Sequence, residues 1–226
     1  MIELVVFDIA GTTVADNGNI NEVFRTSFEN AGITNVDPTD VNRLMGYRKK
    51  EAIRRIVAQY KPGMENDEAL VEAIHEDFCN RMIGYYETTG DLRPLPFAEN
   101  VFNELRSNDI KVALNTGFTR SITAPVLRRL GWDHSPLVQE VICSDEVPQG
   151  RPHPFMIEEL MRRLGVVAAV NVAKVGDTTV DIQEGQNAGC GVVIAVTTGA
   201  CTREELMTCQ PDYVIGSLDL VPSLIL

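Results

Sequence analysis

The feature that most constrains this chain is an apolar run, Val5-Val6-Phe7, that ends abruptly in Asp8 and is followed by Gly11-Thr12-Thr13. Such a run is typical of a parallel strand buried on both faces. Ligands of open parallel sheets bind outside the carboxyl ends of the strands. We therefore expect Asp8 at the functional edge of a parallel sheet. The alternative interpretation is a buried strand and a turn without chemistry.

The remaining sequence divides into a helical region and an alternating region. Apolar residues recur at helical spacing in about 20–31, 48–60 and 67–87, with no strong strand between them. From residue 92, strand-like runs near 110–115, 138–144, 170–175, 191–196 and 213–215 alternate with helical runs near 98–107, 121–130, 154–164 and 181–188. This alternation predicts an α/β fold with a three-layer, Rossmann-like parallel sheet. We expect residues 1–15 and 91–226 to form this catalytic core and residues 16–90 to form an inserted α-helical cap.

Composition and charge narrow the function classes. With 44% apolar and 23% charged residues, the chain of 226 residues is expected to be globular. Its net charge of −12 argues against nucleic acid or an anionic membrane as partner. The five cysteines contain no Cys-x-x-Cys pair, which argues against a disulfide framework or a zinc site. No secretory leader and no membrane-spanning apolar run is visible, so we expect a cytoplasmic protein.

Two further motifs follow strand-like runs and suit an anionic substrate. Thr116-Gly117 stands between a strand and a helix, where a hydroxyl and free N–H groups can anchor a phosphoryl group. Arg151 precedes Pro152 in a loop, and its planar guanidinium suits bidentate contact with the same group. A simple turn and a solvated loop arginine are the respective alternatives. The densest basic cluster, Arg48 to Lys50, would add local positive charge to this acidic chain.

A metal site is predicted from two carboxylates four residues apart. Asp177 and Asp181 stand where a strand opens into a helix, so both can face the pocket. Asp8, Asp177 and the backbone carbonyl of Ala10 would form a hard, oxygen-rich site suited to Mg²⁺. Asp181 would bind through water or orient the other ligands. A helix-capping pair without a metal is the alternative.

In this order the motifs resemble those of the haloacid dehalogenase superfamily. Its first motif is usually Asp-x-Asp-Gly-Thr, in which the first Asp is the nucleophile and the second the general acid/base. Here the second position is Ala10, which cannot move protons. The Asp-x-Ala-Gly-Thr form, the Thr116-Gly117-x-Thr-Arg stretch and Arg151 before proline resemble the phosphonatase branch. The resemblance implies a hydrolase that forms an aspartyl-phosphate on Asp8.

The cap carries the stretch Met45-Gly46-Tyr47-Arg48-Lys49. It is similar to the Met-Gly-x-x-Lys stretch of phosphonatases, which implies substrate contacts at Gly46 and Lys49 and a Schiff base on Lys49. A protonated imine beside a C–P bond provides an electron sink for its cleavage. We expect the helix N-terminus and the flanking cations to lower the Lys49 pKa. The alternatives are a clamp for a second anionic group and a solvated helix face.

One departure leaves the substrate open. The phosphonatase pattern has a histidine three residues past the lysine, where this chain has Ala52, so neither Ala10 nor Ala52 supplies a general acid/base. The first hypothesis is a phosphonatase-like hydrolase that cleaves a small carbonyl phosphonate. The second is a phosphomonoesterase for a small phosphorylated metabolite, and the third is a catalytically degraded binding protein. The expected partners are Mg²⁺, a small anionic phosphonate or phosphate, and a second copy of the chain in a homodimer through the cap.

Overall fold

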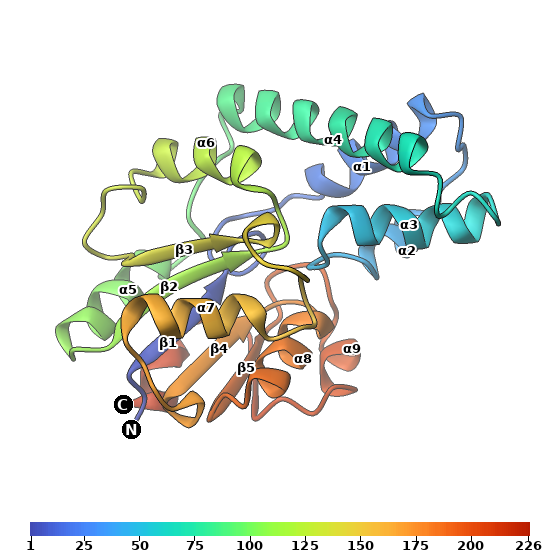
Figure 1. Ribbon diagram of the computed structural model, residues 1–226. Helices are drawn as coiled ribbons and strands as arrows, with labels where there is room; N and C mark the ends of the chain where they lie inside the picture. The colour runs from blue at the N-terminus through green and yellow to red at the C-terminus, as the bar shows by residue number, and fades with distance from the viewer.

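The computed structural model describes residues 1–226 and contains one six-stranded parallel sheet with helices on both faces (Figure 1). The strand order is β3-β2-β1-β4-β5-β6. The predicted α/β, Rossmann-like fold is therefore confirmed. The strands are β1 (Leu4–Asp8), β2 (Lys111–Thr116), β3 (Glu140–Cys143), β4 (Val172–Gly176), β5 (Val192–Val196) and β6 (Tyr213–Ile215).

Alternation along the central strand divides the core into two layers. Phe7 of β1 packs against Phe102 of α5, with ring centroids 5.2 Å apart, and Val5 belongs to the same apolar cluster. Leu4 and Val6 point to the opposite face and pack in a cluster with α7. This is the pattern expected of a strand whose successive side chains face opposite sides. The core helices are α5 (Ala98–Ser107), α6 (Arg120–Leu130), α7 (Phe155–Leu164), α8 (Thr179–Ala188), α9 (Arg203–Met207) and α10 (Val221–Ile225).

The strand order places the site at one point of the sheet. From β1 the chain moves outward through β2 and β3, and it then returns to pair β4 on the other side of β1. Such a reversal opens a crevice at the carboxyl ends of the two central strands. Asp8 ends β1, and Asp177 directly follows β4. The topology thus brings two acids 169 positions apart in the sequence to one edge.

The cap consists of α1 (Asn19–Asn30), α2 (Pro38–Asn42), α3 (Lys49–Tyr60) and α4 (Glu68–Thr88). Figure 1 shows these helices gathered beyond the carboxyl ends of the strands, with α4 lying alongside α6. The two connections to the core lie together, because the Ala15 N–H donates to the Arg93 carbonyl at 3.2 Å. The range 16–90 stays our proposed boundary of the cap.

Apolar packing joins the cap to the core. The largest buried cluster runs without interruption from Phe24 and Phe78 in the cap to the central strands. The ring of Phe78 lies 6.3 Å from that of Phe118, which follows β2. The cap is therefore seated on the core, over the carboxyl edge of the sheet.

Three short helices were absent from the sequence prediction. α2, α9 and α10 each span only five residues, too few to show a helical apolar period. Two of them begin at a side-chain cap: Asp37 of α2 accepts the Thr39 N–H, and Thr202 of α9 accepts the Glu205 N–H. No helix of the chain has the length and apolar character needed to cross a membrane.

Candidate active site

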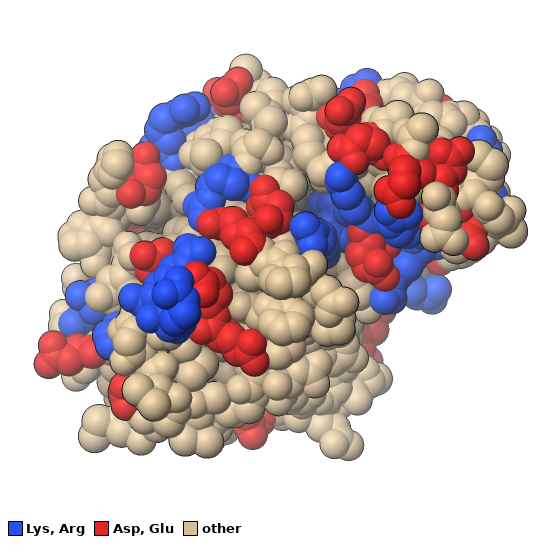
Figure 2. All heavy atoms as spheres, in the orientation of Figure 1, with Lys and Arg blue, Asp and Glu red and all other residues tan.

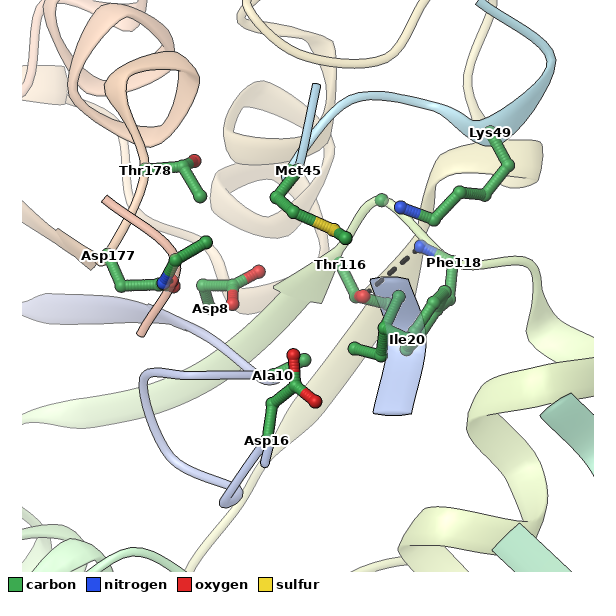
Figure 3. A pocket seen from close by; sticks show the side chains of 13 residues that line it. Asp8, Ala10, Asp16, Ile20, Met45, Lys49, Thr116, Phe118, Asp177 and Thr178 are labelled. Carbon is green, nitrogen blue, oxygen red and sulfur yellow. Dashed lines mark hydrogen bonds between the residues drawn. The ribbon is translucent and has the colours of Figure 1, made fainter. Parts of the chain in front are cut away.

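A small pocket of about 30 Å³ lies between the cap and the carboxyl edge of the sheet (Figure 3). Residues of both the cap and the core line it, and they include most of the site residues predicted from sequence. Arg151 and Asp181 lie behind its wall, where each contacts another residue of the site. The lining residues are Asp8, Ala10, Asp16, Ile20, Met45, Gly46, Lys49, Thr116, Gly117, Phe118, Asp177, Thr178 and Ala200.

Asp8 and Asp177 face each other in this pocket. Asp8 Oδ1 accepts a hydrogen bond from Arg151 Nη1 at 2.7 Å. Burial raises the pKa of Asp8 to about 6, although the charge of Arg151 opposes the rise. Asp177 accepts hydrogen bonds from the Thr12 hydroxyl and the Ala200 N–H, both at 2.8 Å. Burial and the neighbouring Asp8 charge raise the pKa of Asp177 well above its usual value.

These acids fit a divalent cation. One oxygen from each of Asp8, Asp177 and Asp181 lies within 4.8 Å of the others. Burial raises the pKa of both Asp8 and Asp177, and a hard cation with oxygen ligands would stabilise their ionised forms. The cluster can therefore hold a metal ion.

Asp181 is less available to such an ion than the other two acids. Its Oδ1 lies 2.9 Å from Lys174 Nζ and 3.1 Å from the Arg151 guanidinium. Thr178 donates both its N–H and its hydroxyl to Oδ2. Burial pushes the pKa of Asp181 upward, but the two cations outweigh it and hold that pKa below its usual value. Asp181 is thus an ionised partner of Arg151 and Lys174.

Arg151 is held by a buried polar network that the sequence analysis missed. Its Nε donates to Glu184 at 3.0 Å, and its Nη2 donates to Asn115 Oδ1 at 2.6 Å. Lys174 also donates to Asn115 Oδ1, at 2.8 Å, and all four side chains are buried. The visible signal was Lys174 itself, a cation inside the apolar strand Val172–Gly176, because a buried charge requires partners.

The predicted phosphoryl anchor lies where the core meets the cap. Thr116 lines the pocket, and its hydroxyl accepts the Phe118 N–H at 3.2 Å. A Cβ built on Gly117 would lie 2.6 Å from the carbonyl oxygens of Gly46 and Tyr47 in the cap. Gly46 has a φ of +83°, a conformation that favours glycine, and it packs against the side chain of Thr178. The glycines let the cap loop lie directly on the core.

Lys49 is the one cation that lines the pocket, and it comes from the cap. Its side chain is buried, and its Nζ lies 5.6, 5.9 and 5.3 Å from the ring centroids of Phe24, Phe78 and Phe118. It forms no ion pair. Burial lowers the Lys49 pKa to about 8, with the charges of Asp8 and Asp16 opposing the shift.

The flanking cations do not act on Lys49 as the sequence analysis predicted. Lys50 forms an ion pair with Glu72, and Arg48 donates to the Pro148 carbonyl at 3.0 Å. Figure 2 shows Lys and Arg side chains at the seam between cap and core, and Arg48, Lys50, Arg54 and Arg55 line a groove there, outside the pocket. Consecutive helical residues point about 100° apart, so a basic run in sequence does not form one basic patch in the site.

Neither of the two positions expected to hold an acid/base residue carries a side chain that can transfer a proton. Ala10 lines the pocket with a methyl group, and Ala52 is fully buried within α3. Asp16, which the sequence analysis did not consider, lines the same pocket (Figure 3). Its acidic side chain follows the Gly-Thr-Thr turn without a recognisable motif, so only the fold reveals it.

Comparison with known proteins supplies the family. Residues 5–195 match the family described as haloacid dehalogenase-like hydrolase. The chain belongs to this family. It is 33% identical to the phosphonoacetaldehyde hydrolase of Bacillus cytotoxicus over 97% of this chain and 83% of that protein. It is 31% identical to that of Paraburkholderia phytofirmans over 88% of this chain and 76% of that protein. The resemblance to the phosphonatase branch is confirmed, and this haloacid dehalogenase-like protein is a hydrolase.

Solved structures support the fold. A phosphonoacetaldehyde hydrolase-like protein from Oleispira antarctica superposes with a TM-score of 0.85 at 24% identity, covering 99% of this chain and 91% of that one. A protein described as a predicted phosphoglycolate phosphatase from Haemophilus somnus superposes with a TM-score of 0.82 at 19% identity, covering 100% and 98%. At these identities the likeness shows the haloacid dehalogenase fold alone.

Proposed function

We propose that this hydrolase is a Mg²⁺-dependent, phosphonatase-like enzyme that cleaves the C–P bond of a small carbonyl phosphonate. The observation that carries the proposal is the environment of Lys49. A lysine that only clamps an anion works best as a hydrated or ion-paired ammonium. Imine formation instead requires a neutral amine, and burial among aromatic rings lowers the Lys49 pKa to about 8. That amine opens onto the same small pocket as Asp8.

In the proposed reaction the core residues act on phosphorus. Asp8 attacks it and forms an aspartyl-phosphate, which water then hydrolyses. The Thr116 hydroxyl and the backbone at Gly117 hold the phosphoryl oxygens beside the nucleophile. Arg151, which contacts Asp8 at 2.7 Å, holds that carboxylate in position and balances the phosphoryl charge. Lys49 forms the imine that accepts the electron pair of the breaking C–P bond.

Asp8, Asp177 and the Ala10 carbonyl would hold Mg²⁺ in this proposal. When bound, Mg²⁺ supplies positive charge that neutralises the phosphoryl oxygens. Asp181, whose carboxylate is engaged by Lys174 and Arg151, orients those cations from behind the pocket. Gly46 lets the cap loop approach the substrate closely.

Phosphomonoester hydrolysis is the second candidate. Ala52 favours it, because the histidine of the phosphonatase pattern is absent from this chain. Ala10 disfavours it, because an alkoxide leaving group benefits from a protonating acid. In either case the proposed substrate is a small anion. A homodimer through the cap remains a prediction.

The deciding experiment compares carbonyl phosphonates with phosphate esters in the presence of Mg²⁺. With a carbonyl phosphonate, sodium borohydride added during turnover should attach the substrate carbon skeleton to Lys49, as located by peptide mass spectrometry. Lys49→Arg keeps the charge but cannot form an imine, so it should lose phosphonate turnover and trapping.

Lys50→Arg is the matched control, because Lys50 is adjacent in sequence yet pairs with Glu72 outside the pocket. This variant should show the same borohydride trapping of substrate at Lys49 as the wild type. Substantial phosphate ester hydrolysis by Lys49→Arg, with no trapping in the wild type, would refute C–P cleavage and support the phosphomonoesterase function.

A further inference from the structure

The pocket contains one carboxylate that the proposed reaction leaves unused. Asp16 lies between the first strand and α1, in the connection that leads into the cap. Figure 3 shows its carboxylate directed into the cavity on the side of Ala10. Its Oδ1 accepts the Gly18 N–H at 3.1 Å. One oxygen is thus fixed by the turn, and the group remains directed toward the space where a substrate would lie.

Charged and titratable groups from several elements surround this carboxylate. Lys49 from α3 and Tyr86 from α4 both interact with its charge, and Asp8 and Asp177 line the same cavity from the core. Burial raises the Asp16 pKa, while backbone N–H groups and the Lys49 charge oppose the rise. A carboxyl group whose pKa is raised toward neutral pH is suited to exchange protons during turnover.

The other possible proton carriers are poorly placed. His75 contacts Glu72 within the cap, His134 is exposed in a loop of the core, and His153 stacks on Phe155 outside the pocket. Burial raises the pKa of Tyr86 far above neutral pH. Lys49 is committed to the imine, so a separate group must transfer protons.

We propose that Asp16 is the proton-transfer residue of this active site, in place of the acid/base group that is missing at Ala10 and Ala52. The inference rests on the proposed C–P cleavage. When the C–P bond breaks, its electron pair passes into the Lys49 iminium and leaves an enamine, whose carbon takes the proton of the Asp16 carboxylic acid. The imine that results is hydrolysed and frees Lys49. The Asp16 carboxylate then removes a proton from the water that attacks the aspartyl-phosphate, which releases phosphate and regenerates both Asp8 and the acid form of Asp16.

The test is the Asp16→Asn variant. Asparagine keeps the oxygen that accepts the Gly18 N–H but cannot carry the proton, so the turn should be preserved. The turnover number should fall roughly 100- to 10,000-fold, the range of general acid–base catalysis. Borohydride trapping at Lys49 should persist, because the imine still forms. The phosphorylated form of Asp8 should accumulate and appear in the intact mass after an acid quench.

Glu22→Gln is the matched control, because Glu22 is an exposed acid on α1 outside the pocket. It should leave turnover unchanged. Asp16→Ala gives a second measurement, since formate can enter the vacated space and restore turnover in that variant. Wild-type turnover in Asp16→Asn or in Asp16→Ala without formate would overturn the inference, even where the wild type cleaves the phosphonate.

Failure of the proposed function has a different signature. If the wild type turns over only phosphate esters and traps nothing at Lys49, then C–P cleavage is wrong. The same Asp16 variants are then measured on the ester. Loss of ester turnover supports Asp16 as the acid for the leaving alkoxide, and wild-type ester turnover overturns it.

Discussion

The contact between Gly117 and the cap predicts that a single added methyl group will impair the enzyme. A Cβ at Gly117 would lie 2.6 Å from two carbonyl oxygens of the cap loop, those of Gly46 and Tyr47. The φ of Gly117 is not in the positive region, so alanine can adopt its backbone conformation and only the contact is disturbed. Overpacking of this kind costs about 1–3 kcal/mol. The cost arises only when the cap is seated, so the ratio of seated to displaced cap should fall roughly 5- to 150-fold.

The assay is kcat/KM of Gly117→Ala on whichever substrate the wild type hydrolyses. We expect it to fall by up to that factor, reached where the displaced state predominates, because Lys49 reaches the pocket only with the cap seated. Gly84→Ala is the control: Gly84 lies within α4, and its added Cβ would meet nothing within 4 Å. That variant should keep kcat/KM and gain about 0.5–1 kcal/mol of stability from the better helix former. Wild-type kcat/KM in a folded Gly117→Ala variant would refute the reasoning.

Three further outcomes are expected. Asp8→Asn should lower turnover by several orders of magnitude with an unchanged circular dichroism spectrum, because an amide cannot form the acyl phosphate; retention of more than about 1% of wild-type activity would exclude covalent catalysis. Removal of divalent cations with EDTA should abolish activity, and added Mg²⁺ should restore it; full activity after exhaustive chelation would contradict the metal site at Asp8 and Asp177. The rate of borohydride trapping at Lys49 should rise as pH increases through about 8, because deprotonation of the amine at its lowered pKa produces the nucleophile. A rate that is flat between pH 6 and about 9 would show that the neutral amine is not the reacting form.

The fold could be predicted from sequence because its signals are local. Each central strand is a short apolar run flanked by turns, and the strand at Tyr213–Ile215 was predicted with the bounds that the structure shows. Parallel strands share one carboxyl edge, so the residues that follow them were expected to meet there. Asp8, Thr116 and Asp177 do line one pocket. The helices of five residues escaped prediction because they are too short to show an apolar period, and only α2 and α9 carry a side-chain cap as a signal.

The sequence by itself determined the order of the strands and helices, the family motifs, and which acids come together at the edge of the sheet. These depend on patterns a few residues long and on a regular parallel sheet. Only the tertiary structure decided the surroundings of Lys49, because the rings around it come from α1, α4 and the turn after β2. It also decided that burial, and not the neighbouring cations, lowers the Lys49 pKa. The same holds for Asp16 and for the Glu184 network behind Arg151, since burial and charge pairing arise between segments that are far apart in the chain.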